Sequence, residues 1–262
     1  MPDSNAEIME KYEELFETGK RRGIKDITSD QLRELLKRYS GGFGTFSYTI
    51  MDFSSAEFLH VAEDIDQIWG YPAESFLEHG IQFLFNFFPE EHHDAHFKIS
   101  TAAWTYGNSL PPEKLLYSTA NFDNINRRKN GDLFRILTRQ ITVRLDGDGK
   151  IWLTLAIFTD ISHIKEPEIK DEPRLSYYIP KTGEFLIYNP STESMINLDI
   201  LTDRERDILQ LSARDKTASE IADELYISPY TVQTHRANIL KKTGCKNMAE
   251  LVYFSKYHFL TH

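Results

Sequence analysis

The side chains whose types and spacing fit a recognisable chemistry lie between residues 229 and 243. In a helix, where successive residues are rotated by about 100°, one face of this stretch would collect Tyr230, Thr234, Ala237 and Lys241, with Gln233 and Asn238 beside them. Small and polar side chains on such a face can approach the edges of DNA bases. Phosphates are within reach of the nearby cations, which are Arg236, Lys241, Lys242 and Lys246. The pattern predicts a nucleic-acid-binding helix.

The preceding residues indicate how this helix would be positioned. An apolar stripe at helical spacing is formed by Ala218, Ile221, Ala222 and Leu225. Thr217 precedes the stripe and Glu220 lies three residues later, which is the capping-box arrangement. Ser228 can cap a second helix that has Pro229 at its first position, and Gly244 is the residue expected just after its end. The sequence therefore predicts two short helices joined by a tight turn.

The distribution of charge favours the same interpretation. Residues 201–262 hold nine Lys and Arg against eight Asp and Glu, whereas residues 1–200 hold 21 against 32. No acidic residue lies between Leu225 and Ala249. A helix without carboxylates avoids repulsion from a phosphate backbone, and this matters in a chain whose net charge is -10. The alternative is a mildly basic, solvated helix in an ordinary three-helix unit.

Residues 199–262 resemble the LuxR-type (NarL/FixJ) helix-turn-helix domain, an all-α unit of four helices. The resemblance is carried by an ordered series of residues: Leu201-Thr202, Arg204-Glu205, Glu220-Ile221-Ala222, Leu225, Ile227-Ser228, Thr231-Val232, His235, Ile239, Lys242, Gly244 and Glu250-Leu251-Val252. It implies that Gln233, Thr234 and Ala237 face base edges. It also implies backbone contacts on DNA from Thr231, Arg236, Lys241 and Lys242.

The sequence departs from the family pattern in two places. Gln233 and Ala237 occupy positions where the family often has Lys, so we expect fewer charged contacts and a different base preference. Asp215 stands where the loop usually has a small residue, which leaves the local turn geometry open. The fourth helix, from Met248 to about Tyr257, is the usual dimer face in the family. The resemblance therefore implies a homodimer on a two-fold symmetric site in double-stranded DNA.

Length and composition set the remaining bounds. A chain of 262 residues, with 40% hydrophobic and 13% aromatic residues, is long enough for two domains with apolar cores. Cys245 is the one cysteine, so a disulfide framework within the chain is excluded and a cytoplasmic setting fits. Residues 1–17 lack the apolar region of a signal peptide, and no apolar run is long enough to span a bilayer. We therefore expect no membrane partner.

Breaks in composition divide the chain into four segments. We expect a helical segment over residues 1–42, a β-rich domain over 43–165, a linker with a β-hairpin over 166–198, and the helix-turn-helix domain over 199–262. In the hairpin, residues 175–179 and 184–188 would be strands around Pro180-Lys181-Thr182-Gly183. The chain is thus predicted to be α+β, with an antiparallel-sheet domain before an all-α domain.

Residues 43–165 show alternating strands and short helices. Strands are expected over 43–52, 57–62, 116–124, 133–145 and 150–160, and helices over 64–69, from about 72, and over 89–106, followed by an unusually long segment, 105–115. Asp146-Gly147-Asp148-Gly149 has strong turn chemistry between the last two strands. This order is similar to the PAS fold, as are Ile68-Trp69-Gly70-Tyr71-Pro72, Phe88-Pro89-Glu90-Glu91-His92, Lys129-Asn130-Gly131 and Asp160-Ile161-Ser162. The resemblance implies a sensor that encloses a small ligand or contacts a protein partner.

The sequence does not identify a cofactor for this domain. Without a cysteine, residues 43–165 cannot form the covalent flavin adduct of photoreceptors. His92, His93 and His96 are placed where a haem ligand would lie, and His92 and His96 have a spacing that suits one metal ion, but polar residues at a helix start commonly face solvent. We therefore predict no metal. The phenylalanines at 83, 85, 87 and 88 fit a core better than a pocket, and residues 127–129 fit an exposed turn better than a phosphate clamp.

Three functions follow from these patterns. The first is a transcription regulator in which a PAS-like sensor modulates a LuxR-type DNA-binding domain. The second is a DNA-binding protein whose PAS-like domain only dimerises or binds a protein partner. The third is a metal-dependent enzyme that uses the His92 and His96 region, although nucleophile-elbow, phosphate-loop and HExxH motifs are absent. Residues 1–165 also lack the βα alternation of a phospho-acceptor domain. We favour the first function and predict no catalytic residues.

Overall fold

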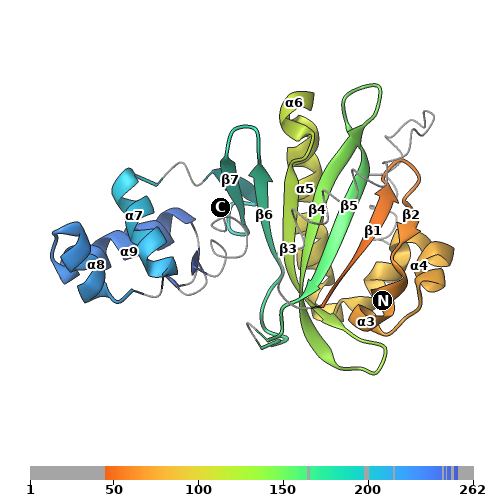
Figure 1. Ribbon diagram of the computed structural model, residues 1–262, viewed down its shortest axis with the longest axis horizontal. Coiled ribbons are helices and arrows are strands. Elements are labelled where there is room, and N and C mark those ends of the chain that lie inside the picture. The colour runs from red at the N-terminus through yellow and green to blue at the C-terminus, as the bar shows by residue number, and fades with distance from the viewer. Residues whose placement is uncertain are drawn as a thin grey trace. The chain divides into compact units, whose positions relative to one another are not determined.

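The computed structural model describes residues 45–163, 166–197, 201–214 and 216–243, together with 245, 247, 248, 251 and 252. These residues form two compact units (Figure 1). The first unit continues to Leu175 and includes residues 179–181, and the second comprises residues 176–178 and those from Thr182 onward. The predictions for residues 1–42 and for Asp215, Gly244 and Lys246 lie outside the described residues.

Five antiparallel strands form the part of the β-sheet that lies in the first unit. They are β1 (Phe46–Asp52), β2 (Glu57–Val61), β3 (Thr119–Arg127), β4 (Leu133–Leu145) and β5 (Ile151–Asp160), in the order β2-β1-β5-β4-β3. The sequence predicted all five. The third begins three residues later than expected because Tyr117 adopts a left-handed backbone conformation with a φ of 64°, which turns the chain before the strand starts.

Short helices precede β3 in the chain and pack on one face of the sheet. They are η1 (Glu63–Ile65), α3 (Asp66–Trp69), α4 (Ala73–His79), η2 (Gly80–Phe87), η3 (Glu90–His92), α5 (His93–Ser109) and α6 (Pro112–Leu115). The long segment expected at 105–115 contains the end of α5 and all of α6. The 3₁₀ helix η2 was not predicted, since its five apolar aromatic and aliphatic residues follow neither the α-helical nor the strand period. The five-stranded antiparallel sheet with helices on one face is the PAS-like architecture that the sequence predicted.

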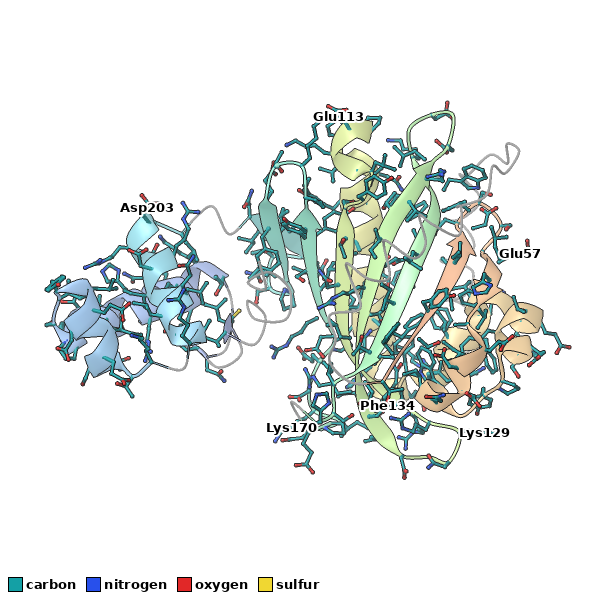
Figure 2. All side chains as sticks on the ribbon, in the orientation of Figure 1. Glu57, Glu113, Lys129, Phe134, Lys170 and Asp203 are labelled. Atoms are coloured by element: carbon teal, nitrogen blue, oxygen red, sulfur yellow. The ribbon has the colours of Figure 1, made fainter. Side chains whose placement is uncertain are left out.

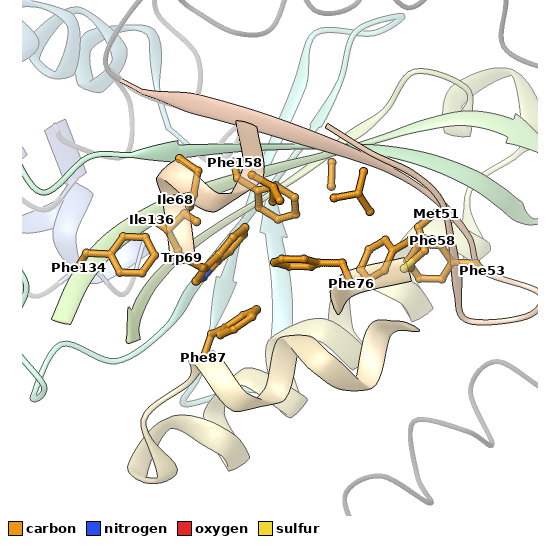
Figure 3. Close-up of a cluster of buried hydrophobic side chains, with 13 residues drawn as sticks. Met51, Phe53, Phe58, Ile68, Trp69, Phe76, Phe87, Phe134, Ile136 and Phe158 are labelled. Carbon is orange, nitrogen blue, oxygen red and sulfur yellow. The ribbon is translucent and has the colours of Figure 1, made fainter. Parts of the chain in front are cut away.

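The main core of the first unit lies between these helices and the sheet (Figure 3). Trp69 is 2% exposed and stacks on Phe87 at 5.2 Å between ring centroids, while Phe158 of β5 meets its edge at 4.8 Å. Its indole Nε1 donates a hydrogen bond of 3.1 Å to Oδ1 of Asn126. Phe83 and Phe85 pack against the same cluster, so the interpretation as core is confirmed for these two and for Phe87, whereas Phe88 stacks on His96.

A second apolar cluster is formed by β4 and β5. The alternation of apolar residues in these strands places Ile141, Val143, Leu153, Leu155 and Ile157 together, as their period of two predicts. Between the strands, Asp146 Oδ1 accepts hydrogen bonds from the backbone N–H groups of Asp148 and Lys150. Gly149 has a φ of 76°, which explains why glycine occupies this turn.

The second unit combines a small β region with three helices. The predicted hairpin is confirmed, because β6 (Arg174–Ile179) and β7 (Glu184–Asn189) are hydrogen-bonded neighbours. An additional strand that the sequence did not reveal, β8 (Ser194–Asn197), pairs antiparallel with β7. The helices are α7 (Asp203–Ala213), α8 (Ala218–Leu225) and α9 (Pro229–Thr243).

The three helices of the second unit enclose their own core. Leu201, Ile208, Ile221, Val232 and Ile239 are each at most 2% exposed within it. The predicted fourth helix lies mostly outside the described residues. Of that segment, Met248, Leu251 and Val252 are helical, and Leu251 is completely buried in the same core. Among the described residues, no helix is both long and apolar enough to cross a membrane.

Candidate nucleic-acid interface

The first helix of the predicted pair begins with the capping box that the sequence indicated. Oγ1 of Thr217 accepts a hydrogen bond of 3.3 Å from the backbone N–H of Glu220, and Oε2 of Glu220 accepts one of 2.7 Å from the N–H of Thr217. The hydrogen bonds that the Thr217 hydroxyl, at 2.7 Å, and the Thr217 N–H donate to the Glu220 carboxylate lower the pKa of Glu220 from its usual value. Two backbone donors at the start of α8 are thereby satisfied, which fixes the first residue of the helix.

The turn between α8 and α9 is tight. Tyr226 ends α8 in the left-handed conformation with a φ of 54°, and the backbone N–H of Ile227 bonds the carbonyl of Ala222 at 3.0 Å. Ser228 then caps α9, because its Oγ accepts a hydrogen bond of 3.0 Å from the N–H of Thr231. Both signals read from the sequence, the cap at Ser228 and Pro229 at the first position, are confirmed.

Helix α9 has one buried and one exposed face. Val232 and Ile239 are completely buried and face the core, and His235 is half-buried between the faces. The exposed residues are Tyr230, Gln233, Thr234, Ala237, Asn238 and Lys241. The three residues expected to face bases are therefore all accessible. The Thr234 hydroxyl donates to the carbonyl of Tyr230 at 3.1 Å, and its oxygen can still accept a hydrogen bond.

The four residues expected to contact phosphates differ in their surroundings. The Lys241 side chain is exposed. Arg236 donates to Oγ of Ser212 at 3.1 Å and to the carbonyl of Lys216 at 3.3 Å, so it joins α9 to the end of α7. The Lys242 ammonium donates to Oε2 of Glu205 at 2.7 Å. The Thr231 hydroxyl lies 2.8 Å from that of Ser228.

Glu205 of α7 is a residue whose role was not recognised from the sequence. Only 3% of it is exposed, and its Oε2 accepts hydrogen bonds from Lys242 and from the N–H and hydroxyl of Thr202. Burial alone would raise the pKa of Glu205, but the hydrogen bonds from Lys242 and Thr202 lower it below its usual value. Thr202 and Glu205 form a second capping box, at the start of α7 beside Asp203 (Figure 2). Their spacing, Thr-x-x-Glu, was the available signal.

In the first unit, His92 and His96 do not face solvent as the sequence suggested. His92 is 4% exposed, and its Nε2 lies 2.6 Å from the carbonyl oxygen of Ile169. The His96 ring stacks on Phe88 at 3.8 Å between centroids, and its Nε2 lies 3.4 Å from Oγ of Ser100. Burial lowers the pKa of His96 to about 3. The expectation failed because these residues turn inward where η3 continues into α5.

Residues 127–129 were expected to form an exposed turn. This prediction is partly wrong, because the Arg128 side chain has partners within the unit. Its guanidinium lies 4.0 Å above the Phe134 ring and bonds the carboxylate of Asp160 and the carbonyl of Ile68. It therefore ties the β3–β4 turn to α3 and to the end of β5. Within the described part of the chain, no three His, Cys, Asp or Glu residues are grouped so as to hold a metal ion.

The geometry of the second unit corresponds to a defined class of protein. A capped helix, a tight turn and a second helix with an exposed polar face make up a helix-turn-helix domain, the element by which many transcription regulators bind the DNA major groove.

Comparison with known proteins supports this class. Residues 199–255 match the family model described as bacterial regulatory proteins, luxR family. Over 53 residues the chain is 45% identical to the spore germination protein GerE of Bacillus subtilis, which is 20% of this chain and 72% of GerE. Over 55 residues it is 47% identical to the transcriptional regulatory protein UhpA of Salmonella typhimurium, which is 21% of this chain but only 28% of UhpA. The chain belongs to the luxR family of bacterial regulatory proteins.

Solved structures were also compared. An RNA-binding Light-Oxygen-Voltage receptor superposes with a TM-score of 0.37 at 17% identity, over 55% of this chain and 37% of that chain. The Vibrio cholerae VqmA dimer, described as a LuxR-type receptor, superposes with a TM-score of 0.34 at 16% identity, over 88% of each chain.

Proposed function

We propose that this protein is a transcription regulator that binds double-stranded DNA through α9 and that its PAS-like domain modulates this binding. The observation that carries the proposal is the exposed face of α9, which presents polar and small side chains, an exposed cation at Lys241 and no carboxylate. Such a face can enter the major groove without repulsion from phosphates. The proposed domains are residues 43–165 and 199–262, joined by 166–198.

Within this proposal the side chains have separate roles. Gln233, Thr234 and Ala237 face the base edges, where Gln233 can make a bidentate contact to adenine and Ala237 can contact a thymine methyl group. Lys241 contacts a phosphate directly, because it is exposed. Thr231, Arg236 and Lys242 have hydrogen-bond partners within the domain, so a phosphate would have to share their donors or replace those partners.

We further propose that the protein acts as a homodimer on an inverted repeat. A single helix of this size makes few base contacts, and two helices related by two-fold symmetry would double them at half-sites roughly 34 Å apart. A chromosomal target would place the protein in the cytoplasm. The proposal assigns it no catalytic activity.

The salt dependence of DNA binding tests the proposal. A double-stranded DNA selected from a random pool would be titrated with wild type, Lys241→Ala and the control Lys181→Ala, which removes an equal charge in the β6–β7 turn. Lys241→Ala should reduce the slope of log affinity against log salt by about 1 per protomer, and Lys181→Ala should leave it unchanged. Equal slopes for all three proteins would show that Lys241 does not contact a DNA phosphate.

A small uncharged ligand of the PAS-like domain is the second part of the proposal. His96 Nδ1 and Asn124 Oδ1 are buried and make no hydrogen bond of good geometry, although the two side chains interact with one another, and the His96 ring contacts Phe88 and lies 6.2 Å from Phe122. Buried polar atoms without partners call for one. Since the pKa of His96 is about 3, its ring is neutral near pH 7, and because Nε2 lies 3.4 Å from Oγ of Ser100 it is Nδ1 that the ring offers to a ligand beside Phe88. This combination favours a ligand over a domain that only dimerises.

Native mass spectrometry of freshly purified protein tests this second part and the dimer together. A mass that is lost on denaturation in wild type and absent from His96→Phe would support a ligand held at this place. A dimer with no additional mass in either protein would favour the alternative, in which the PAS-like domain dimerises or binds a protein partner.

A further inference from the structure

Residues 166–173, here called the strap, connect the end of the PAS-like domain to β6. They contain neither helix nor strand. Loops of this kind are usually held by few contacts and exchange their amide hydrogens readily. The strap is instead bound to the first unit at two places, and both binding residues come from the interior of that unit.

The first attachment is made by His92. Its ring is almost fully buried, and Nε2 donates a hydrogen bond of 2.6 Å to the carbonyl of Ile169. His92 ends η3 and immediately precedes α5, so the strap is joined to the start of the long helix. Because the acceptor is a backbone oxygen, the contact fixes the path of the strap whatever side chain stands at position 169.

The second attachment is made by Arg135 of β4. Its guanidinium donates to Oδ2 of Asp171 in the strap at 2.8 Å and to Oδ2 of Asp123 in β3 at 2.7 Å. The Arg135 and Asp123 side chains are 1% and 0% exposed, whereas Asp171 is 17% exposed. The backbone of Arg135 also bonds the residues that follow β5: its carbonyl accepts from the N–H of Ile161, and its N–H donates to Oγ of Ser162. Arg135 therefore holds the chain where it leaves the sheet and again in the strap.

The two carboxylates that bond Arg135 have different roles: Asp123 neutralises the buried charge, and Asp171 positions the strap. A buried guanidinium requires a carboxylate, and Asp123 alone provides it. Asp171 adds a second negative charge at the rim, where water can solvate it, so its carboxylate is not needed to neutralise Arg135. The contact between Asp171 and Arg135 therefore holds the strap in place. By contrast, Glu168 pairs with Lys170 on the surface, where both side chains are at least half exposed, and such pairs contribute little.

We propose that His92 and Arg135 form an attachment site for the strap, through which the PAS-like domain controls the DNA-binding domain. The two attachments lie on different elements, η3 and β4, so any shift of η3 and the following helix α5 against the sheet changes how the strap is held. A ligand beside His96 and Asn124 would contact α5 and β3, and would therefore act on this attachment. The inference rests on the proposed function and deepens it by naming the regulatory contact.

The test uses the full-length chain and a matched pair of variants. Asp171→Ala removes the attachment to Arg135, while Glu168→Ala removes a carboxylate of the same strap that pairs with Lys170 on the surface. Hydrogen exchange of strap peptides would be measured by mass spectrometry, and affinity would be measured for a double-stranded DNA selected from a random pool. His92→Gln changes the other attachment, to the carbonyl of Ile169, and tests the release of the strap independently. Arg135 is left unchanged, because its loss would leave the buried carboxylate of Asp123 without its cation.

We expect Asp171→Ala to speed amide exchange in the strap by about tenfold, with an unfolding midpoint close to that of wild type. We also expect DNA binding about three- to tenfold weaker, since a loose strap no longer preorganises the DNA-binding domain. Glu168→Ala should match wild type in both measurements. Unchanged exchange in Asp171→Ala would overturn the attachment, and faster exchange with unchanged affinity would overturn its regulatory role.

The two proposals fail in different ways. If wild type binds no double-stranded DNA, the proposed function is wrong and the regulatory role falls with it, but the exchange data still decide whether His92 and Arg135 hold the strap. If wild type binds DNA and His92→Gln and Asp171→Ala both leave affinity unchanged, the proposed function stands and the strap is only a connector.

Discussion

Strand β3 and helix α9 both carry rows of polar side chains, yet the two rows have opposite surroundings. In β3, Asn121, Asp123, Asn124 and Asn126 are between 1% and 3% exposed. In α9, Gln233, Thr234, Asn238 and Lys241 are all exposed. In the first row, Asp123 and Asn126 have partners inside the protein, Arg135 and Trp69. The second row remains available to a partner.

The comparison shows that polarity of a segment does not by itself mark an interface. A buried polar group needs a partner within the fold, because its desolvation is otherwise uncompensated. The polar face of a surface helix has water as its partner and can exchange it for base edges and phosphates. Mutations in β3 and its partners should therefore change stability, and mutations in α9 should change binding.

The largest expected effect is that of Arg135→Met. It leaves the carboxylates of Asp123 and Asp171 without their cation, one of them fully buried, and should destabilise the first unit by about 3–5 kcal/mol. All three tryptophans of the chain, at positions 69, 104 and 152, lie in this unit, so urea unfolding followed by tryptophan fluorescence reports on it alone. The control Arg127→Met changes an exposed arginine and should cost well under 1 kcal/mol. Equal losses would refute the special role of Arg135.

Gln233→Ala tests the exposed polar residues of α9. Its side chain is exposed, so stability should stay within about 0.5 kcal/mol of wild type. If Gln233 makes a bidentate contact, the difference in binding free energy between the preferred base and the others at one base pair should fall by about 1–3 kcal/mol. Competition among DNAs that differ at single positions would measure this. Lys241→Ala should weaken binding to all of them alike, and identical profiles for the two variants would show that the assigned roles are wrong.

His96 predicts a pH dependence of stability in the first unit. Its pKa in the folded protein is about 3, below the usual value of 6.5, so between these values the unfolded chain binds the proton more readily. The stabilisation is complete above pH 6.5 and is lost as the pH falls towards 3, by at most about 1.4 kcal/mol per pH unit. Urea unfolding at pH 7, 6 and 5 should show this slope in wild type and a smaller one in His96→Phe.

The control for this pH series is His79→Gln, which changes an exposed histidine of α4. Its slope should equal that of wild type. A slope in His96→Phe as steep as in wild type would show that His96 does not carry the titration.

The smallest expected effect is that of Thr217→Ala at the start of α8. Loss of the cap should destabilise the second unit by about 1 kcal/mol, because the N–H of Glu220 loses its acceptor. Helical circular dichroism during urea unfolding would measure it, and Thr217→Ser, which keeps the hydroxyl, should retain most of the stability. An Ala variant as stable as the Ser variant would mean that the capping box contributes nothing here.

The order and type of most elements could be predicted from the sequence, because they depend on local patterns. The two-residue alternation in β4 and β5, the turn at Asp146–Gly149 and the caps at Thr217 and Ser228 are each set by neighbours in the chain. The exposed face of α9 also follows from helical periodicity once Val232 and Ile239 are assigned to the core. Elements with weak periodicity, such as η2 and β8, were missed for the same reason.

The contacts between distant segments could not be predicted in this way. His92 and Ile169 are 77 residues apart, Arg135 and Asp171 are 36 apart, and Glu205 and Lys242 are 37 apart. The local sequence around His92 is polar and suggested a solvated helix start, and Lys242 stood out only as a cation near DNA. The sequence by itself determined the helix-turn-helix element and its family, because helical period, caps and charge are local properties. Only the tertiary structure decided which histidines are buried, which cations are already paired and where the strap is held, because these depend on side chains that packing brings together from separate parts of the chain.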